Sequence, residues 1–129
     1  MLKTGILNPA LLSLLARVRH TNTLVIADRG FPFWPEVETV DISLADDLPT
    51  VRQVLAALRP NFDIARVFAA EEFRRQNSPQ KLEALLALLR PAELVFEPHA
   101  EFKKRVPGAI GLIRTGDTTP YGNLILESG

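Results

Sequence analysis

The side chains best suited to proton chemistry in this sequence are its two histidines, His20 and His99. Histidine is the one side chain whose ordinary pKa lets it give and take a proton near neutral pH. Asp28 directly follows a short apolar run, Thr23–Ala27, that is typical of a buried strand. In an open α/β sheet, ligands bind beyond the carboxyl ends of the strands, so Asp28 stands where a site is expected. His20 and Asp28 are therefore the first candidates for an acid–base site, in which the carboxylate orients the histidine or holds a substrate hydroxyl.

Two other interpretations of these residues remain open. An aspartate after a strand commonly forms a turn or caps a helix, with no role in chemistry. His20, His99 and Asp28 also have the composition of a two-histidine, one-carboxylate metal site. The sequence has neither a Gly-x-Ser-x-Gly nucleophile motif nor a glycine-rich phosphate loop, so it does not indicate nucleophilic hydrolysis or phosphate cradling. We expect no metal and no cofactor.

Size and charge narrow the class of protein. The chain has 129 residues, 15 basic and 15 acidic side chains, and no cysteine. This length predicts one domain spanning residues 1–129, and the zero formal charge gives no electrostatic footprint for nucleic acid. No apolar run approaches a membrane span, and Pro9 interrupts the first segment too early for a signal peptide. We therefore expect a cytoplasmic protein with no nucleic-acid or membrane partner, and the 47% hydrophobic content of a neutral chain favours self-association.

Helices and strands alternate along the sequence. Helices are predicted by capping residues or prolines followed by apolar stripes, at Asn8–Arg19, Pro49–Arg59, Ser78–Arg90 and, more briefly, His99–Val106. Strands are predicted by short apolar or β-branched runs, at Thr23–Ala27, Val37–Ile42, Phe62–Ala70, Leu94–Phe96, Ala109–Arg114 and Tyr121–Leu126. We expect the last two strands to form a hairpin-like or neighbouring pair. The alternation predicts an α/β fold, a single three-layer domain with a mixed, partly parallel central sheet flanked by helices.

An aromatic, proline-rich segment, Phe31–Pro35, follows Asp28 and its neighbours. Its two prolines disfavour regular structure, and its apolar area must pack on something. Phe33 and Trp34 either form a wall against a sugar or a neighbouring subunit, or fold back onto the core of their own domain.

Three segments of the sequence stand out together. They are Arg19–Gly30, with the sequence RHTNTLVIADRG, then His99–Lys103, with HAEFK, and Ile113–Leu126, with IRTGDTTPYGNLIL. These segments resemble the family of D-ribose pyranases and L-fucose mutarotases. The resemblance covers essentially the whole chain in order. Tyr121-Gly122-Asn123 matches the fucose branch at its middle residue, whereas Arg114–Pro120 is more similar to the ribose branch. Arg29 stands where the ribose branch usually has a small residue, which raises the question of whether its side chain fills or redirects the pocket.

The resemblance implies a function and a set of site residues. It implies that His20 is the catalytic acid/base and that the residues contacting the sugar are Asp28, His99, Lys103, Tyr121 and Asn123. It also implies a large ring of subunits, commonly a decamer, with sugar clefts near subunit boundaries. Because the polar residues are split between an early and a late segment, we expect some sites to draw on two chains.

The residue types fit this chemistry independently of the family resemblance. Opening a cyclic sugar removes a proton from the anomeric hydroxyl and delivers one to the ring oxygen, which needs an acid and a base but no redox centre. An amide, a phenol and an ammonium supply the donors and acceptors that sugar hydroxyls require. Two rival functions remain, a non-catalytic sugar-binding or transport accessory protein and a scaffold whose ring assembly is itself the function.

Overall fold

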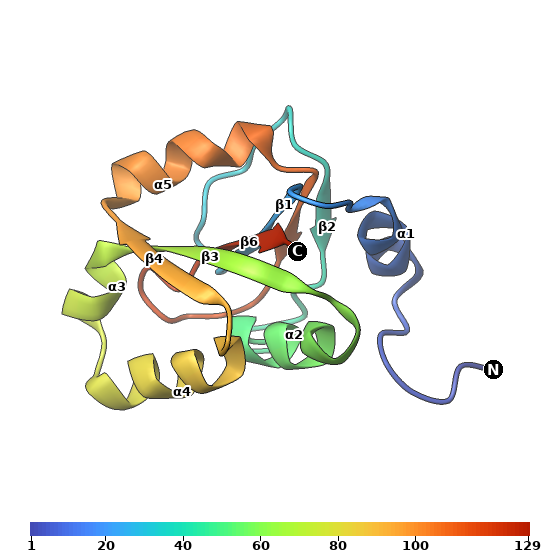
Figure 1. The fold of residues 1–129 in the computed structure, drawn as a ribbon, viewed down its shortest axis with the longest axis horizontal. Coiled ribbons are helices and arrows are strands. Elements are labelled where there is room, and N and C mark those ends of the chain that lie inside the picture. Colours follow the sequence, from blue (N-terminus) through green and yellow to red (C-terminus); the bar gives the residue numbers. More distant parts are fainter.

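The computed structural model describes all 129 residues and is built on one six-stranded sheet with the strand order β2-β5-β1-β6-β3-β4 (Figure 1). The strands are β1 (Thr23–Ala27), β2 (Thr39–Asp41), β3 (Ile64–Ala70), β4 (Glu93–Glu97), β5 (Gly111–Arg114) and β6 (Leu124–Ser128). The helices are α1 (Pro9–Arg17), α2 (Val51–Leu58), α3 (Glu71–Gln76), α4 (Pro79–Leu89) and α5 (His99–Arg105). Two short 3₁₀ turns, Arg59–Asn61 and Val106–Gly108, follow α2 and α5. None of these helices is long and apolar enough to cross a membrane.

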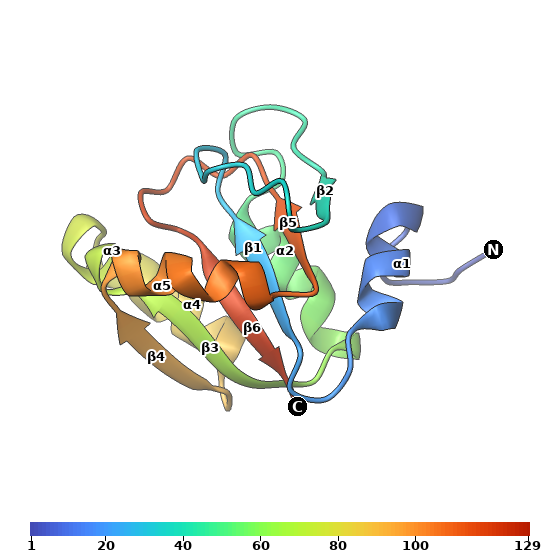
Figure 2. The same ribbon diagram turned by 90° about the horizontal axis from the view of Figure 1, so that it is seen from above.

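The sheet is mixed, as predicted. β1 and β2 both pair with β5 in parallel, and β3 pairs with β4 in parallel. β6 runs antiparallel to its two neighbours, β1 and β3. The carboxyl ends of β1, β2 and β5 therefore lie beside the amino end of β6, at one end of the strands. This end of the sheet is at the top of Figure 2.

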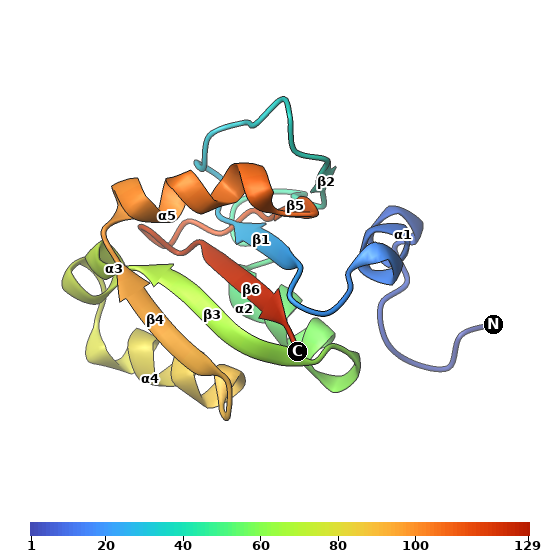
Figure 3. The same cartoon turned by 45° about the horizontal axis from the view of Figure 1, so that its top comes forward.

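Helices cover the two faces unequally. Figures 1 and 3 show α5 on one face and α2 and α4 on the other, with α1 at the β2 end of the sheet. The face under α2 and α4 holds a core cluster of 18 buried residues, and the face under α5 a cluster of 9. Strand β1 is buried from Leu24 to Ala27 because both clusters cover it. The predicted α/β, three-layer arrangement is confirmed.

Capping residues set the starts of the main helices. The Asn8 side chain accepts the Leu11 amide at 2.9 Å, and the Ser78 hydroxyl accepts the Lys81 amide at 3.2 Å. Thr50 and Gln53 form a reciprocal capping box at the start of α2. These interactions satisfy amides that would otherwise have no partner in the first helical turn. The helix that was expected from Pro49 therefore begins at Val51, with Thr50 as its cap.

One expectation from the sequence, the pairing of the last two strands, is wrong. The segments Ala109–Arg114 and Tyr121–Leu126 do not form a hairpin or a neighbouring pair, because β1 lies between β5 and β6 and pairs with both. The connection from β5 to β6 is held to the end of β1 by Thr115, whose amide and hydroxyl both donate to the Ala27 carbonyl at 2.9 and 2.8 Å. Helix α3, which follows β3 directly, has no counterpart among the helices predicted from the sequence.

The aromatic segment Phe31–Pro35 packs partly on its own core and partly faces outward. Phe31 is buried and Trp34 is half-buried, and both pack against the core under α5. Phe33 is 71% exposed, so it is available to a partner.

Candidate functional site

The carboxyl end of β1 and the amino end of β6 bring Asp28 and Asn123 together. The Asp28 amide donates to the Asn123 side-chain oxygen at 2.7 Å, and the Gly30 amide donates to the Asp28 carboxylate at 2.9 Å. Asn123 is buried, whereas Asp28 is half-buried. Antiparallel pairing of β1 with β6 creates this meeting, because the end of one strand lies beside the start of the other.

His99 enters the same region from the first residue of α5. Its backbone amide donates to both carboxylate oxygens of Glu72, at 3.2 and 3.1 Å, which ties the start of α5 to α3. Its ring stands edge-on to the ring of Tyr121, with centroids 5.1 Å apart and an interplanar angle of 89°. The Nε2 atom of His99 is buried and has no hydrogen-bond partner in the protein. A buried polar atom of this kind requires a partner, so His99 is set up to bind a polar ligand.

These residues line a cavity of about 200 Å³. Its walls are Asp28, Gly30, Phe31, Pro32, His99, Tyr121 and Asn123. Pockets for drug-sized ligands measure about 300–1,000 Å³, so this cavity suits a smaller molecule. A carboxylate, an imidazole, a phenol and an amide converge on it, which is a mixture of donors and acceptors suited to a polyhydroxylated ligand.

Burial shifts the pKa values of Asp28 and His99 in opposite directions. Burial raises the pKa of Asp28, and the nearby Asp117 charge adds to the rise, while hydrogen bonds from the amides of Gly30 and Phe31 and from Asn123 oppose it. Burial lowers the pKa of His99, and the Lys103 charge lowers it further, against the charges of Glu72 and Asp28. Both shifts favour the neutral form of the group, so His99 is an uncharged imidazole at neutral pH.

Tyr121 and Lys103 take different positions relative to this cavity. Tyr121 has a left-handed φ of 55°, a conformation that costs a non-glycine residue free energy and is concentrated at functional sites. Lys103 lies one turn along α5 from His99 and is half-buried. Its charge acts on His99, but its side chain is not part of the cavity wall.

His20 lies apart from the other predicted site residues. It is exposed in the turn between α1 and β1, at the amino end of β1, whereas Asp28 follows the carboxyl end. Figure 2 shows this turn beside the C-terminus, at the end of the sheet opposite the loop that follows β1. The intervening strand has five residues and spans roughly 17 Å at about 3.3 Å per residue. One chain therefore brings together Asp28, His99, Tyr121 and Asn123 but not His20, and the metal set of His20, His99 and Asp28 is not assembled within one chain.

Two arginines near Asp28 have separate roles. Arg29 points away from the cavity and pairs with Asp46 at 2.6 Å, so it does not fill the pocket. Arg114, at the end of β5, donates to the carbonyl oxygens of Asp28 at 3.1 Å and Pro32 at 3.2 Å, and also to that of Phe31. The Arg114 guanidinium thereby fixes the loop that forms one wall of the cavity.

Sequence reasoning missed three positioning residues, Glu72, Arg114 and Asp117. Asp117 is buried, and its carboxylate accepts the amides of Val51 at 2.8 Å and Thr119 at 2.7 Å. It therefore anchors the loop carrying Tyr121 and Asn123 to the start of α2. Each of the three residues lies at or just after the carboxyl end of a strand, as Asp28 does. This shared position is the feature of the sequence that could have identified them.

The whole chain, residues 1–129, matches the model of the RbsD / FucU transport protein family. A D-ribose pyranase from Geobacillus kaustophilus is 42% identical over 129 residues, covering 100% of this chain and 94% of the relative. A D-ribose pyranase from Lactobacillus gasseri is 37% identical, covering 100% of this chain and 98% of the relative.

Solved structures agree with this sequence similarity. The structure of Bacillus subtilis RbsD complexed with D-ribose superposes with a TM-score of 0.93 at 38% identity, covering 100% of this chain and 98% of that one. The fucose mutarotase in complex with L-fucose from Streptococcus pneumoniae has a TM-score of 0.80 at 17% identity, covering 95% of this chain and 92% of that one, and shares the fold. The full-length family match and the identity to two pyranases show that this chain belongs to the RbsD / FucU family.

Proposed function

We propose that this protein interconverts the cyclic forms of a free monosaccharide by acid–base ring opening, with D-ribose as its first candidate substrate. The observation that carries the proposal is the small cavity in which Asp28, Tyr121 and Asn123 surround the unpartnered Nε2 atom of His99. Two relatives that match over the full chain are D-ribose pyranases, and the B. subtilis relative was solved with D-ribose.

Each of these side chains keeps a hydrogen-bond donor or acceptor that is available to a sugar hydroxyl. The Asn123 oxygen accepts the Asp28 amide, and the Asn123 NH₂ group has two hydrogens, so one stays available to a sugar hydroxyl beside the hydrogen bond to the Asp28 carboxylate. The Asp28 carboxylate accepts the amides of Gly30 and Phe31 and the Asn123 side chain, and its two oxygens have about four lone-pair sites, so it can also accept a hydroxyl. The neutral His99 ring and the Tyr121 phenol can each donate or accept. We infer that these four side chains hold the sugar, with Lys103 acting at the cavity's border.

We infer that the proton transfer itself falls to His20 of a neighbouring subunit. Ring opening takes a proton from the anomeric hydroxyl and returns one to the ring oxygen, and an exposed histidine can perform both transfers. His20 lies at the end of the sheet opposite its own chain's cavity. It is therefore free to act on a sugar bound in the cavity of another chain. This arrangement makes the active site a shared one.

A shared site of this kind implies a head-to-tail contact. The end of one subunit that carries His20 must meet the end of the next that carries Asp28, and such a repeated contact between two different surfaces forms a ring when the rotation between neighbours closes. Three exposed apolar side chains lie in the loops that follow β1 and β2, namely Phe33 at 71% exposure, Leu44 at 83% and Leu48 at 51%. Side chains of this kind support burial against another copy. We therefore propose a ring-forming homo-oligomer, with a decamer as the expected size.

Exchange spectroscopy on free sugars tests the proposed activity. Saturation of one anomeric proton of D-ribose should transfer faster to the other ring forms in the presence of the protein, and L-fucose and other aldoses form the comparison panel. Sugar binding without faster exchange would instead identify a sugar-binding accessory protein. Unchanged exchange and no binding across the panel would end the proposal.

A further inference from the structure

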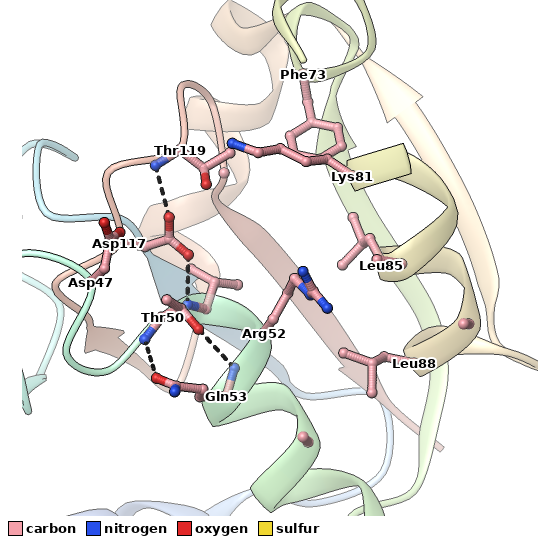
Figure 4. A pocket seen from close by; sticks show the side chains of 15 residues that line it. Asp47, Thr50, Arg52, Gln53, Phe73, Lys81, Leu85, Leu88, Asp117 and Thr119 are labelled. Carbon is pink, nitrogen blue, oxygen red and sulfur yellow. Dashed lines mark hydrogen bonds between the residues drawn. The ribbon is translucent and has the colours of Figure 1, made fainter. Parts of the chain in front are cut away.

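A second and larger cleft lies between α2 and α4, on the face of the sheet opposite α5 (Figure 4). Its volume is about 680 Å³, within the range of about 300–1,000 Å³ that small-molecule sites occupy. None of the residues proposed to hold the sugar lines it. The cleft is therefore a separate place at which the protein can take a ligand.

The cleft combines an apolar wall with two unpaired cations. Phe73, Leu85 and Leu88 supply the apolar wall. Arg52 extends from α2 into the middle of the cleft, and the Lys81 ammonium is directed toward Thr119 (Figure 4). Neither cation takes part in any of the eight ion pairs of the structure, which join other residues.

The two carboxylates of the cleft are already engaged. Asp117 accepts two backbone amides, those of Val51 and Thr119. Asp47 accepts both the amide and the hydroxyl of Thr118, at 2.9 Å each. Amide and hydroxyl donors thus occupy both carboxylates. Arg52 and Lys81 form no ion pair, and the Lys81 charge acts on Asp47 only from a distance, where it helps to lower the pKa of that carboxyl.

We propose that this cleft binds a small phosphate monoester with an apolar or planar body. Arginine presents a planar fork of donors that matches phosphate oxygens, and lysine adds a compact positive charge. Phe73, Leu85 and Leu88 then cover the body of the ligand. The cleft is large enough for the body and the phosphate together.

The cleft shares one wall with the sugar cavity. Asp117, Thr119 and Gly122 line the cleft, while Tyr121 and Asn123 of the same loop line the sugar cavity. The loop has little slack, since a β-carbon at Gly122 would come within 3.0 Å of the Thr119 carbonyl oxygen. A ligand that contacts Asp117 or Thr119 in the cleft therefore contacts the loop that also carries Tyr121 and Asn123, and we expect the two cavities to be coupled through it.

Amide NMR on the intact protein tests the binding, with phenyl phosphate as the probe. Phenyl phosphate carries both required parts, whereas benzyl alcohol lacks the charge and inorganic phosphate lacks the apolar body. A probe this small should bind with a dissociation constant on the order of 1 mM. We expect saturable shifts at Arg52, Ala56 and Lys81 and at the shared loop, and binding at least about ten-fold weaker for each partial probe.

Variants separate this site from general charge attraction. Arg52→Gln and Lys81→Gln should each weaken phenyl phosphate binding about five-fold or more. Lys3→Gln, which removes the same charge from the N-terminal segment, should leave it unchanged. Ala56→Trp fills the cleft from α2 and should abolish the binding while the amide spectrum of the rest of the protein stays native.

The site assignment fails if shifts are scattered over the surface, if they survive Ala56→Trp, or if inorganic phosphate binds as tightly as phenyl phosphate. It also fails if the α2 and α4 amides do not respond, as they would not if other subunits cover the cleft. Shifts in the cleft without any at Tyr121 or Asn123 would overturn the coupling to the sugar cavity. These readouts do not depend on the proposed sugar chemistry.

Discussion

His99 is held by aromatic packing and left with one unsatisfied nitrogen. The rings of Tyr121, Phe102 and Phe31 lie at centroid distances of 5.1, 5.8 and 6.1 Å, and they fix the orientation of the imidazole. Burial and Lys103 together lower its pKa from the ordinary value of 6.5, so the ring is neutral at pH 7. A neutral ring offers either a donor or an acceptor at Nε2, which is what a sugar hydroxyl requires.

Titration of His99 by NMR should show this environment directly. We expect its pKa to lie below 6.5, because burial and Lys103 disfavour the charged form. The folded state then binds fewer protons than the unfolded chain, so stability should fall as the pH drops from about 6.5 through the folded-state pKa. Lys103→Gln should raise the pKa of His99, and Asp28→Asn should lower it further.

Lys104→Gln is the matched control for that titration, because it removes a neighbouring charge of α5 that does not contribute to the His99 shift. A pKa of His99 at or above 6.5 would contradict the description of this site.

Asp28→Asn should reduce sugar ring exchange severely, by about 10²-fold or more, because the carboxylate is the strongest hydroxyl acceptor in the cavity. The Asp28 backbone amide still donates to Asn123, so the substitution should leave the fold intact. Asp46→Asn removes an exposed carboxylate that only pairs with Arg29 and should preserve activity. If Asp28→Asn exchanged the sugar as fast as the control Asp46→Asn, Asp28 would not be part of the site.

At the scale of elements, α5 both begins with His99 and covers one face of the sheet. Phe102 is fully buried under it and meets Phe31 edge-on, with centroids 6.0 Å apart and an interplanar angle of 86°. The buried cluster on this face is half the size of the cluster on the other, at 9 residues against 18. The position of His99 therefore depends on a few large side chains.

Phe102→Ala should lower the free energy of unfolding by about 3–5 kcal/mol, through lost burial and the cavity left behind. Denaturant unfolding followed by circular dichroism measures the change. Lys104→Ala on the exposed side of α5 should stay within about 0.5 kcal/mol of the parent. A small effect of Phe102→Ala would mean that α5 is not held by this contact.

The sequence predicts those elements whose signals are local. Asn8 and Ser78 mark helix starts, leucine stripes mark buried faces, and Thr23–Ala27 marks the central strand, so these elements are confirmed. Helix α3 has six residues and no side-chain cap, which left its charged sequence without a helical signal. The insertion of β1 between β5 and β6 is a long-range arrangement that local turn patterns do not encode.

The candidate site, like the fold, could be predicted where its signals are local and not where they depend on contacts between distant segments. The position of Asp28 after a strand predicts a site there, and the structure places Asp28 beside His99, Tyr121 and Asn123, which the family resemblance had added. The anchoring roles of Glu72, Arg114 and Asp117 depend on contacts between distant segments, which spacing along the chain does not show. Our proposal that His20 serves the cavity of a second chain involves a contact between subunits, which spacing within one sequence does not show.

For the whole molecule, we propose that a sugar cavity and its acid/base come from different subunits. His20 lies at one end of the sheet and Tyr121 at the other, so a head-to-tail contact between subunits would be needed to unite them. Mixed oligomers test this arrangement in one measurement. His20→Ala and Tyr121→Phe proteins, each of low activity, are unfolded together in equal amounts and refolded, and solution mass confirms that mixed oligomers of the parent size have formed.

Exchange spectroscopy of D-ribose on those mixed oligomers is the deciding measurement. With random assembly and sites that take His20 from one subunit and Tyr121 from the next, about one site in four receives an intact residue from each parent. We therefore expect roughly a quarter of the wild-type exchange activity, far above either variant alone. No recovery in verified mixed oligomers would place both residues in the site of a single chain, and a monomeric mass for the wild-type protein would contradict the shared site altogether.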